Sequence, residues 1–280
     1  MNITINKLVF IIIIFIIIVY VILIKIINFL LYIYKNDIKV GKNIINFIYI
    51  YNEIFNNEDY KLNINYDNFV IFDIGANMGL FSLWINENFK NTKVHLFEPI
   101  DELLDIAKYN LNNMKKNNNQ FTFNNVGLSN NNYNDIIYYY YYANGLSTIN
   151  DFNDKLKYHN IVEQLVLNII LQFYIKKQIK LITIKNYIIN NNITNIDLCK
   201  IDVEGFENNV IEGFFDKINI VKIFIIEIEI KNLKIIMKKL YNYYIYTKNN
   251  LSKDNFIIIY AIRKDIIKRE EKGNVLKTFF

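Results

Sequence analysis

Hydrophobic and polar residues alternate along the chain in the rhythm of short strands and amphipathic helices. Apolar runs predict strands at 70–74 and 94–97, and longer helical periods predict helices at 79–88 and 101–113. Strands that alternate with helices in this way are typical of βαβ units on a parallel sheet. This half of the chain therefore predicts an α/β domain.

The same rhythm continues in the second half of the chain. Strands are predicted at 121–126, 136–142, 195–202 and 221–230, and helices at 206–217 and 233–244. The strand at 256–262 is expected to close the sheet, antiparallel to a strand around Ile245. Residues 160–177 have the apolar spacing of an amphipathic helix, which could pack against the sheet, cover a substrate pocket or rest on a bilayer.

The N-terminal region departs from this rhythm. Every residue from Leu8 to Ile24 is Leu, Val, Phe, Ile or Tyr, and apolar residues resume from Ile26 to Tyr34. A helix of this length could cross ~30 Å of hydrocarbon, and the run lacks the small residues of a signal-peptide cleavage site. We expect residues 1–44 to form a transmembrane anchor and linker, with a buried core helix as the alternative. More lysines follow the run than precede it, which predicts a single-pass membrane protein whose domain at 45–280 is cytosolic.

Composition limits the classes of function. A chain of 280 residues with 52% hydrophobic residues can bury one α/β core, which we place at about 65–262. The formal charge of +5 is spread along the chain, so nucleic-acid binding is not indicated. The one cysteine, Cys199, excludes an internal disulfide. Composition does not predict an oligomeric state.

The most informative motif follows the first predicted strand and reads V-I-F-D-I-G-A-N-M-G at 70–79. Gly75 and Gly79 allow the backbone to bend sharply and approach a ligand where a helix begins. About twenty residues later, a second strand ends at Glu98, where a ribose diol is usually held. The motif has one Gly-x-x-x-Gly and lacks the dinucleotide fingerprint G-x-G-x-x-G. It indicates a loop for a nucleotide-type cofactor.

Four segments in order resemble the FkbM family of S-adenosylmethionine-dependent methyltransferases. They are 70–79, Phe97-Glu98-Pro99, Gly127-Leu128-Ser129 and Lys200-Ile-Asp-Val-Glu-Gly205, and the resemblance covers most of residues 65–262. It implies a Rossmann-like class I methyltransferase fold, with a mostly parallel seven-stranded sheet, an antiparallel last strand and helices on both faces. Residues 144–148 resemble the family's Ser-containing segment and 181–188 its strand-to-helix stretch, although Asn186 stands where the family has an acid.

The resemblance implies S-adenosyl-L-methionine as the cofactor. This ligand combines a cationic amino acid moiety, a ribose diol and a sulfonium, so its pocket needs carboxylates and close backbone more than phosphate-binding cations. Glu98 would accept from both ribose hydroxyls. The expected cofactor contacts are Asp73, Gly75, Asn77, Gly79, Glu98 and Ser129. The alternative roles are a helix N-cap for Asp73 and a solvated loop acid for Glu98.

Methyl transfer to a hydroxyl requires an in-line arrangement and a proton acceptor. Asp202 and Glu204, at the tip of the strand at 195–202, lie where the methyl group is expected to point. Glu204 is the favoured base, Asp202 is the second candidate and Glu227 is held in reserve. The alternative is a structural role for the acids before Gly205. No His-rich spacing accompanies them, so we expect a metal-independent enzyme.

The leading hypothesis is a membrane-anchored O-methyltransferase. Its acceptor is expected to be a hydroxyl of a sugar, glycan or lipid-linked metabolite, since the family that the chain resembles often modifies such groups. A non-catalytic scaffold for membrane partners and an NAD-dependent reductase are the alternatives, and the missing middle glycine disfavours the reductase.

Overall fold

The computed structural model describes residues 2–41, 44–114, 117–140, 147, 149, 174–247 and 256–267. The chain forms two compact units, Met1–Val40 and Gly41–Phe280, and each is described by itself. The first unit contains one helix, α1 (Asn2–Lys35). The helix ends in a turn in which the N–H of Ile38 donates to the carbonyl of Ile33 at 3.0 Å.

The predicted membrane anchor requires a correction. A helix that spans a bilayer needs about 20 consecutive, predominantly apolar residues. Over the residues that the structure describes, no helix combines the length and the apolar character needed to cross a membrane. On this criterion the transmembrane anchor at 1–44 is wrong, and so is the single-pass membrane localisation with a cytosolic domain that followed from it.

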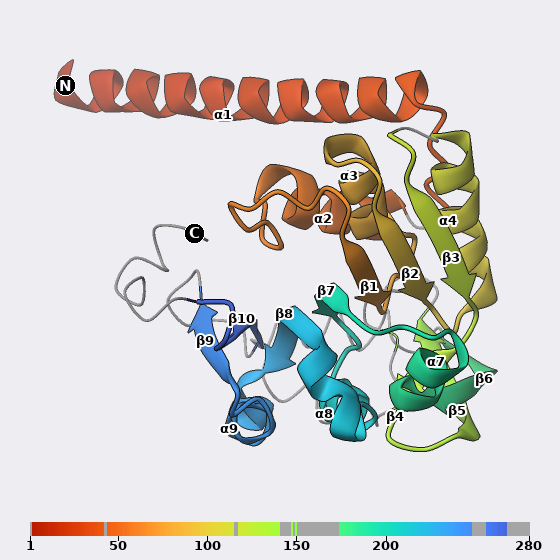
Figure 1. The fold of residues 1–280 in the computed structure, drawn as a ribbon. Coiled ribbons are helices and arrows are strands. Elements are labelled where there is room, and N and C mark those ends of the chain that lie inside the picture. Colours follow the sequence, from red (N-terminus) through yellow and green to blue (C-terminus); the bar gives the residue numbers. More distant parts are fainter. Residues whose placement is uncertain are drawn as a thin grey trace. The chain divides into compact units, whose positions relative to one another are not determined.

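The second unit is built on a seven-stranded sheet with the order β3-β2-β1-β7-β8-β10-β9 (Figure 1). Its strands are β1 (Val70–Ile74), β2 (Lys93–Phe97), β3 (Gln120–Asn124), β7 (Ile196–Ile201), β8 (Val221–Glu229), β9 (Tyr243–Thr247) and β10 (Phe256–Arg263). The first five strands in this sheet pair in parallel, whereas β10 is antiparallel to both β8 and β9. The mostly parallel sheet with an antiparallel C-terminal pair is therefore confirmed.

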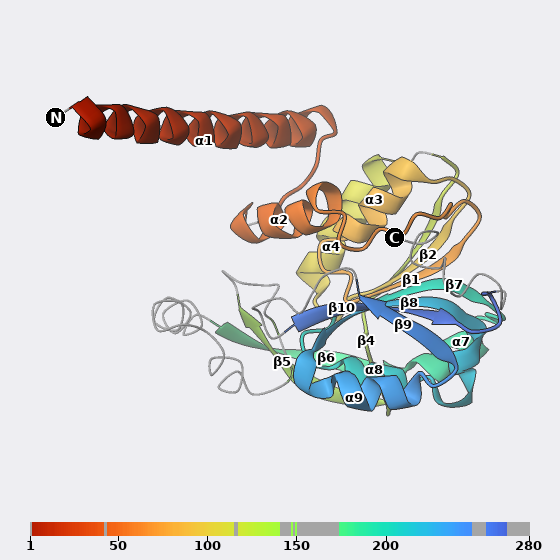
Figure 2. The same cartoon turned by 90° about the vertical axis from the view of Figure 1, so that its left-hand side faces the viewer.

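Helices cover both faces of this sheet, and its central strands β1, β7 and β8 are largely buried. Figure 2 shows α3 (Leu80–Asn88) and α4 (Asp101–Asn113) on one face and α8 (Glu207–Glu212) and α9 (Ile230–Lys239) on the other. All six residues of β7 are buried, as expected for a parallel strand covered on two sides. Among its described residues, this unit also contains the helices α2 (Ile44–Tyr51) and α7 (Ile184–Asn190), the π-helix η1 (Asn52–Asn56) and a 3-10 helix described below.

A second, three-stranded sheet has the order β4-β6-β5. It contains β4 (Gly127–Ser129), β5 (Tyr133–Tyr140) and β6 (Tyr174–Thr183). The predicted helix at 160–177 lies outside the described residues up to 173, and residues 174–177 are strand. Tyr174 to Lys177 pair with β5, so the cross-strand ladder and not the helical spacing decides their conformation. The segment at 144–148 also lies outside the described residues, except for Ser147.

The predicted helix at 206–217 is shorter in the structure. The α8 helix ends at Glu212, and a 3-10 helix, η3 (Phe215–Ile220), follows. The carbonyl of Gly213 accepts a hydrogen bond from the N–H of Lys185 at 3.0 Å, outside the helix. A Cβ on Gly213 would lie 2.1 Å from the carbonyl oxygen of Ser129. This close backbone contact fixes the end of the helix against the second sheet.

We expect Gly213→Ala to lower the free energy of unfolding by roughly 1–3 kcal/mol, because a backbone carbonyl cannot move aside cheaply. Gly127→Ala is the matched control, since its added Cβ would meet Leu181 Cδ2, the end of a flexible side chain, at 2.5 Å. Urea unfolding of both variants measures the difference. An equal loss in the two variants would contradict the role assigned to Gly213.

Candidate active site

The carboxyl ends of four neighbouring parallel strands bring the candidate residues to one level of the sheet. Ile74 of β1 pairs with Phe97 of β2 and with Ile201 of β7. Ile201 in turn pairs with Ile226 of β8. The residues that follow these partners are Gly75, Glu98, Asp202 and Glu227. Between β1 and β7 the chain order changes direction, and such switch points are where open α/β sheets bind ligands.

The turn after β1 is tightly wound and is held from both sides. Its left-handed residues are Gly75, Asn77 and Gly79, with φ of 74°, 50° and 77°. The N–H groups of Gly75 and Ala76 both donate to the carbonyl of Phe97, at 3.0 and 3.1 Å. A Cβ on Gly75 would lie 1.8 Å from the carbonyl oxygen of Asp202. Glycine is therefore required at this position by the backbone that follows β7 as well as by φ.

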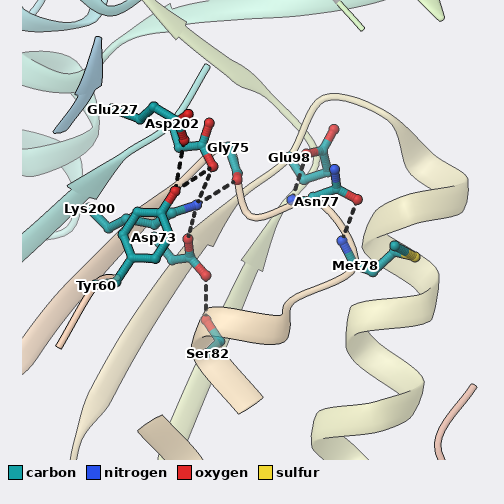
Figure 3. A network of polar contacts seen from close by, with 10 residues as sticks. All are labelled: Tyr60, Asp73, Gly75, Asn77, Met78, Ser82, Glu98, Lys200, Asp202 and Glu227. Atoms are coloured by element: carbon teal, nitrogen blue, oxygen red, sulfur yellow. Dashed lines mark hydrogen bonds and ion pairs between the residues drawn. The ribbon is translucent and has the colours of Figure 1, made fainter. Parts of the chain in front are cut away.

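Glu98 closes the same turn from the tip of β2. Its Oε2 accepts from the N–H of Asn77 and its Oε1 from the N–H of Ile100, both at 2.9 Å. The Oδ1 of Asn77 accepts from the N–H of Met78 at 2.9 Å (Figure 3). Glu98 is 5% exposed, which contradicts the alternative of a solvated loop acid. Burial raises the pKa of its carboxyl to about 7, although the two backbone hydrogen bonds lower it.

Asp73 and Lys200 are register partners on β1 and β7 and form a buried ion pair beneath the turn. The Nζ of Lys200 lies 3.5 Å from Oδ1 of Asp73 and donates to the carbonyl of Gly75 at 3.2 Å. The Oδ2 of Asp73 accepts from the hydroxyl of Ser82 on α3 at 2.7 Å. Gly79 occupies the N-cap position of α3, so the alternative of Asp73 as the N-cap is wrong. Asp73 supports the turn from below.

Lys200 also connects this turn to the ends of β7 and β8. Its Nζ lies 3.2 Å from Oδ2 of Asp202 and 5.4 Å from the centre of the Tyr60 ring. The hydroxyl of Tyr60 donates to Oε2 of Glu227 at 2.8 Å and lies 3.4 Å from Oδ2 of Asp202. Figure 3 shows these side chains converging around the ammonium group. The structure thus brings together the predicted residues Asp73, Asp202 and Glu227.

The charges in this network shift one another's proton affinities. Burial alone would lower the pKa of Lys200, but the charges of Asp202 and Asp73 raise it above its usual range. Burial raises the pKa of Glu227 well above its usual range, and the charges of Asp202 and Glu204 raise it further. Lys200 is therefore an ammonium at neutral pH, while Glu227 holds a proton more tightly than an ordinary glutamate.

Glu204 lies in the strained turn that follows Asp202. It has a φ of 53°, and Gly205 has a φ of 97°. The N–H of Gly205 donates to Oε1 of Glu207 at 2.8 Å. Glu207 is 2% exposed, and burial raises the pKa of its carboxyl to about 7. Left-handed non-glycine residues cluster at functional sites, so the strain at Glu204 fits the site predicted there.

Two expectations remain predictions. Ser129 is buried at the end of β4, and its hydroxyl lies 3.3 Å from Oδ1 of Asn130 and 3.4 Å from the hydroxyl of Tyr133. These contacts belong to the second sheet and not to the network around Lys200. Within the described ranges, no group of three or more His, Cys, Asp or Glu side chains could hold a metal ion. The metal independence of the enzyme is untested.

A comparison with protein families identifies the domain that carries this network. The family model described as the methyltransferase FkbM domain matches residues 73–243, which is more than half of the chain. The chain belongs to the FkbM methyltransferase family. The resemblance of the sequence motifs to this family is confirmed, and the matched residues extend from Asp73 past Glu227.

Individual relatives of this FkbM chain are distant or match a short segment. The chain is 38% identical over 63 residues to methyltransferase sdnD of Sordaria araneosa, a match to 22% of this chain and 24% of that protein. The crystal structure of methyltransferase FkbM from Methylobacillus flagellatus KT is 13% identical, with a TM-score of 0.42, over 71% of this chain and 44% of that one. The M. capricolum TrmK complex with S-adenosyl-homocysteine is 16% identical, with a TM-score of 0.39, over 74% and 69%.

The chain covers only part of the length of the proteins that it matches. The chain matches about a quarter of the length of the curated relative and under half of the M. flagellatus chain. Membership of the FkbM family therefore rests on the family model, and the activity of the whole protein is a proposal.

Sequence reasoning did not single out Tyr60, Ser82 or Lys200 as site residues. Lys200 had a signal, because it is a lysine near the end of a mostly apolar strand, two residues before Asp202. Tyr60 had none, since it precedes the first predicted strand and lies 142 residues from its partner Asp202. Glu53 on η1 was also missed, and burial together with the charge of Asp202 raises the pKa of its carboxyl to about 8.

The raised pKa values of Glu98 and Glu207 predict a pH-dependent stability. Each carboxyl has a folded pKa of about 7 against 4.5 in the reference state, so the folded chain binds more protons between these values. The contribution of each group to the free energy of unfolding is therefore lost as pH rises from about 4.5 to 7. The Gln variants lack this pH-dependent loss. Measured against the native chain, the free energy of unfolding of Glu98→Gln and of Glu207→Gln is therefore expected to gain roughly 1–3 kcal/mol from pH 5 to pH 8.

Urea unfolding at the two pH values measures this gain. Glu212→Gln is the control, because the hydrogen bond from Lys239 lowers the pKa of Glu212 and keeps it ionised across the range. A gain of the same size in the control, or none in the two test variants, would count against the buried-acid assignment.

Proposed function

We propose that this member of the FkbM family is an S-adenosylmethionine-dependent methyltransferase whose cofactor binds at the carboxyl ends of β1, β2 and β7. One observation carries the proposal. Gly75, Glu98 and Asp202 follow register-paired residues on these three neighbouring strands, at the switch point of a sheet that belongs to a methyltransferase family.

The chemistry of these residues fits a cationic nucleoside. The buried carboxylates of Asp73 and Glu98 flank the turn, and Oδ1 of Asp73 has no hydrogen-bond partner among the described residues. The ammonium of Lys200 is engaged by Asp73 and Asp202, so it is not available to hold a phosphate. An acidic site of this kind favours an ammonium and a sulfonium over the pyrophosphate of a dinucleotide.

Each part of the turn has a distinct role in this proposal. Each carboxylate oxygen of Glu98 accepts a hydrogen bond from a different backbone N–H. Each oxygen also keeps a second acceptor position, which is free for a ribose hydroxyl. The left-handed turn from Gly75 to Gly79 presents backbone to the rest of the ligand, and Asn77 fixes its shape through Met78. The bound cofactor would supply a methyl group on a positively charged sulfur.

Three acids at the ends of β7 and β8 are the candidates for the proton acceptor. The side chain of Asp202 is 27% exposed and is committed to its ion pair with Lys200. Burial and the neighbouring acids raise the pKa of Glu227, so its carboxylate binds a proton more tightly than that of an ordinary glutamate, as suits a proton acceptor. Glu204 lies in the strained turn beside it. These contacts support Glu204 or Glu227 as the base, with Asp202 orienting Lys200.

For the acceptor we propose a hydroxyl group, and support comes from the charge of the site. A hydroxyl must lose a proton as it is methylated, and the acids at the ends of β7 and β8 can accept it. The same acids disfavour an anionic acceptor such as a phosphate or carboxylate. The choice of a sugar or glycan hydroxyl rests on the family resemblance alone.

Methyl transfer tests the proposal directly. The purified full chain is incubated with methyl-labelled S-adenosylmethionine and extracted glycans, and label is expected in a product that resists alkali, as a methyl ether does. Calorimetric titration with S-adenosylhomocysteine and with NAD separates the alternatives. Binding of NAD alone would favour a reductase, and binding of neither ligand would favour a non-catalytic scaffold.

Glu98→Ala is expected to weaken the binding of S-adenosylhomocysteine by roughly 1–3 kcal/mol, because the ribose hydroxyls lose their acceptors. Asp105→Asn is the matched control, since Asp105 is an exposed acid on α4 that pairs with Lys108. Calorimetry on folded samples of both variants measures the difference. An unchanged dissociation constant in Glu98→Ala would contradict the ribose assignment.

A further inference from the structure

Tyr60 reaches the site from outside the part of the chain that defines the family. The family match begins at residue 73, whereas Tyr60 lies in the preceding segment. Its hydroxyl donates to Oε2 of Glu227 at 2.8 Å, and its ring lies over the Nζ of Lys200. Tyr60 is 3% exposed, so this contact is shielded from solvent.

The segment around Tyr60, which we call the covering segment (residues 52–62), is held on both sides of this residue. Before it, Ile54 of η1 is buried, and the carbonyl of Asp59 accepts a hydrogen bond from the hydroxyl of Tyr260. After it, the N–H of Leu62 donates to the hydroxyl of Tyr66 at 2.9 Å. The ring of Tyr60 also packs against that of Phe81 of α3 in a T-shaped arrangement, with ring centres 6.0 Å apart. These contacts fix where the hydroxyl points.

Several charged groups face the pair formed by Tyr60 and Glu227. They come from η1, β7 and the turn after β7, and they are Glu53, Lys200, Asp202 and Glu204. Acids outnumber the single ammonium in this set, so a carboxylate at Glu227 experiences net repulsion. A neutral hydrogen-bond donor is the group that stabilises the carboxylate without adding charge.

We infer that Tyr60 is a positioning residue of the methyl-transfer site, whose hydroxyl holds the carboxylate of Glu227 ready to accept the proton of the acceptor hydroxyl. This role rests on the proposed function. In the transfer, the acceptor O–H bond breaks and its proton passes to Glu227. The oxygen forms a bond to the methyl carbon, and the electron pair of the broken carbon–sulfur bond stays on the sulfur of the sulfonium donor.

The proton affinities of the two groups agree with this role. Burial raises the pKa of Tyr60 well above its usual range, and the charges of Asp202 and Glu227 raise it further, so the hydroxyl stays a donor. Burial and the neighbouring acids raise the pKa of Glu227, and the hydrogen bond from Tyr60 lowers it. Removal of the hydroxyl should therefore make Glu227 hold its proton to a higher pH.

The test is an NMR titration of the full chain with carbon-13-labelled glutamate, in which Glu227→Gln assigns the Glu227 signal. In Tyr60→Phe, the titration midpoint of Glu227 is expected to rise by roughly one pH unit or more. Tyr187→Phe is the matched control, because it removes a buried hydroxyl whose partner is His95 and leaves both the acids and the covering segment untouched. An unchanged midpoint in Tyr60→Phe, or an equal rise in the control, would overturn the assignment.

A second measurement does not depend on the folding of Tyr60→Phe. The native chain is expected to show a slowly exchanging tyrosine hydroxyl proton that disappears in Glu227→Ala, and its absence from the native chain would also overturn the assignment.

Titration with S-adenosylhomocysteine keeps the two proposals separate. If the native chain does not bind this ligand, the proposed function fails, while the midpoint of Glu227 still decides whether Tyr60 controls its proton.

Discussion

The buried ammonium of Lys200 is the interaction on which the active-site edge of the sheet depends. It contacts Asp73 on β1, Asp202 after β7 and the carbonyl of Gly75. Asp73 has no exposed surface, and an isolated buried carboxylate would be strongly destabilising. The ion pairs therefore allow carboxylates to gather at the switch point, and they tie the glycine turn to the strand across the switch.

Around this ammonium the acids divide into two groups with different environments. Glu98 lies on the β2 side, where backbone N–H groups of the turn and of the next helix hold both of its oxygens. Asp202 and Glu227 lie on the β7 and β8 side, where Tyr60 and Lys200 hold them. The first group suits recognition of a ribose diol, and the second suits proton transfer. In the function proposed above, this single row of strand ends would hold the cofactor and the reacting hydroxyl side by side.

The part of the fold that could be predicted from the sequence is the part decided by local pattern. The α4 helix has the predicted bounds 101–113, and β1 and β2 lie within a residue of theirs, because buried parallel strands and amphipathic helices leave a direct hydrophobic signature. Residues 174–177 have helical spacing but form strand, since β5 supplies pairing partners that the local pattern does not show. The α8 helix ends early because Gly213 meets the carbonyl of Ser129, which is remote in sequence.

For the candidate site, too, some features could be predicted from local sequence and others depend on tertiary contacts. The sequence by itself determined the family and the acids at the strand tips, because a glycine turn and a carboxylate directly after an apolar strand are local features. Tertiary structure decided that Lys200 joins Asp73 to Asp202 and that Tyr60 bonds to Glu227. The physical reason is that these contacts form across strands and from a preceding segment, and Tyr60 is separated from its two acidic partners by 142 and 167 positions in the sequence. Only the folded chain brings these groups within hydrogen-bonding distance.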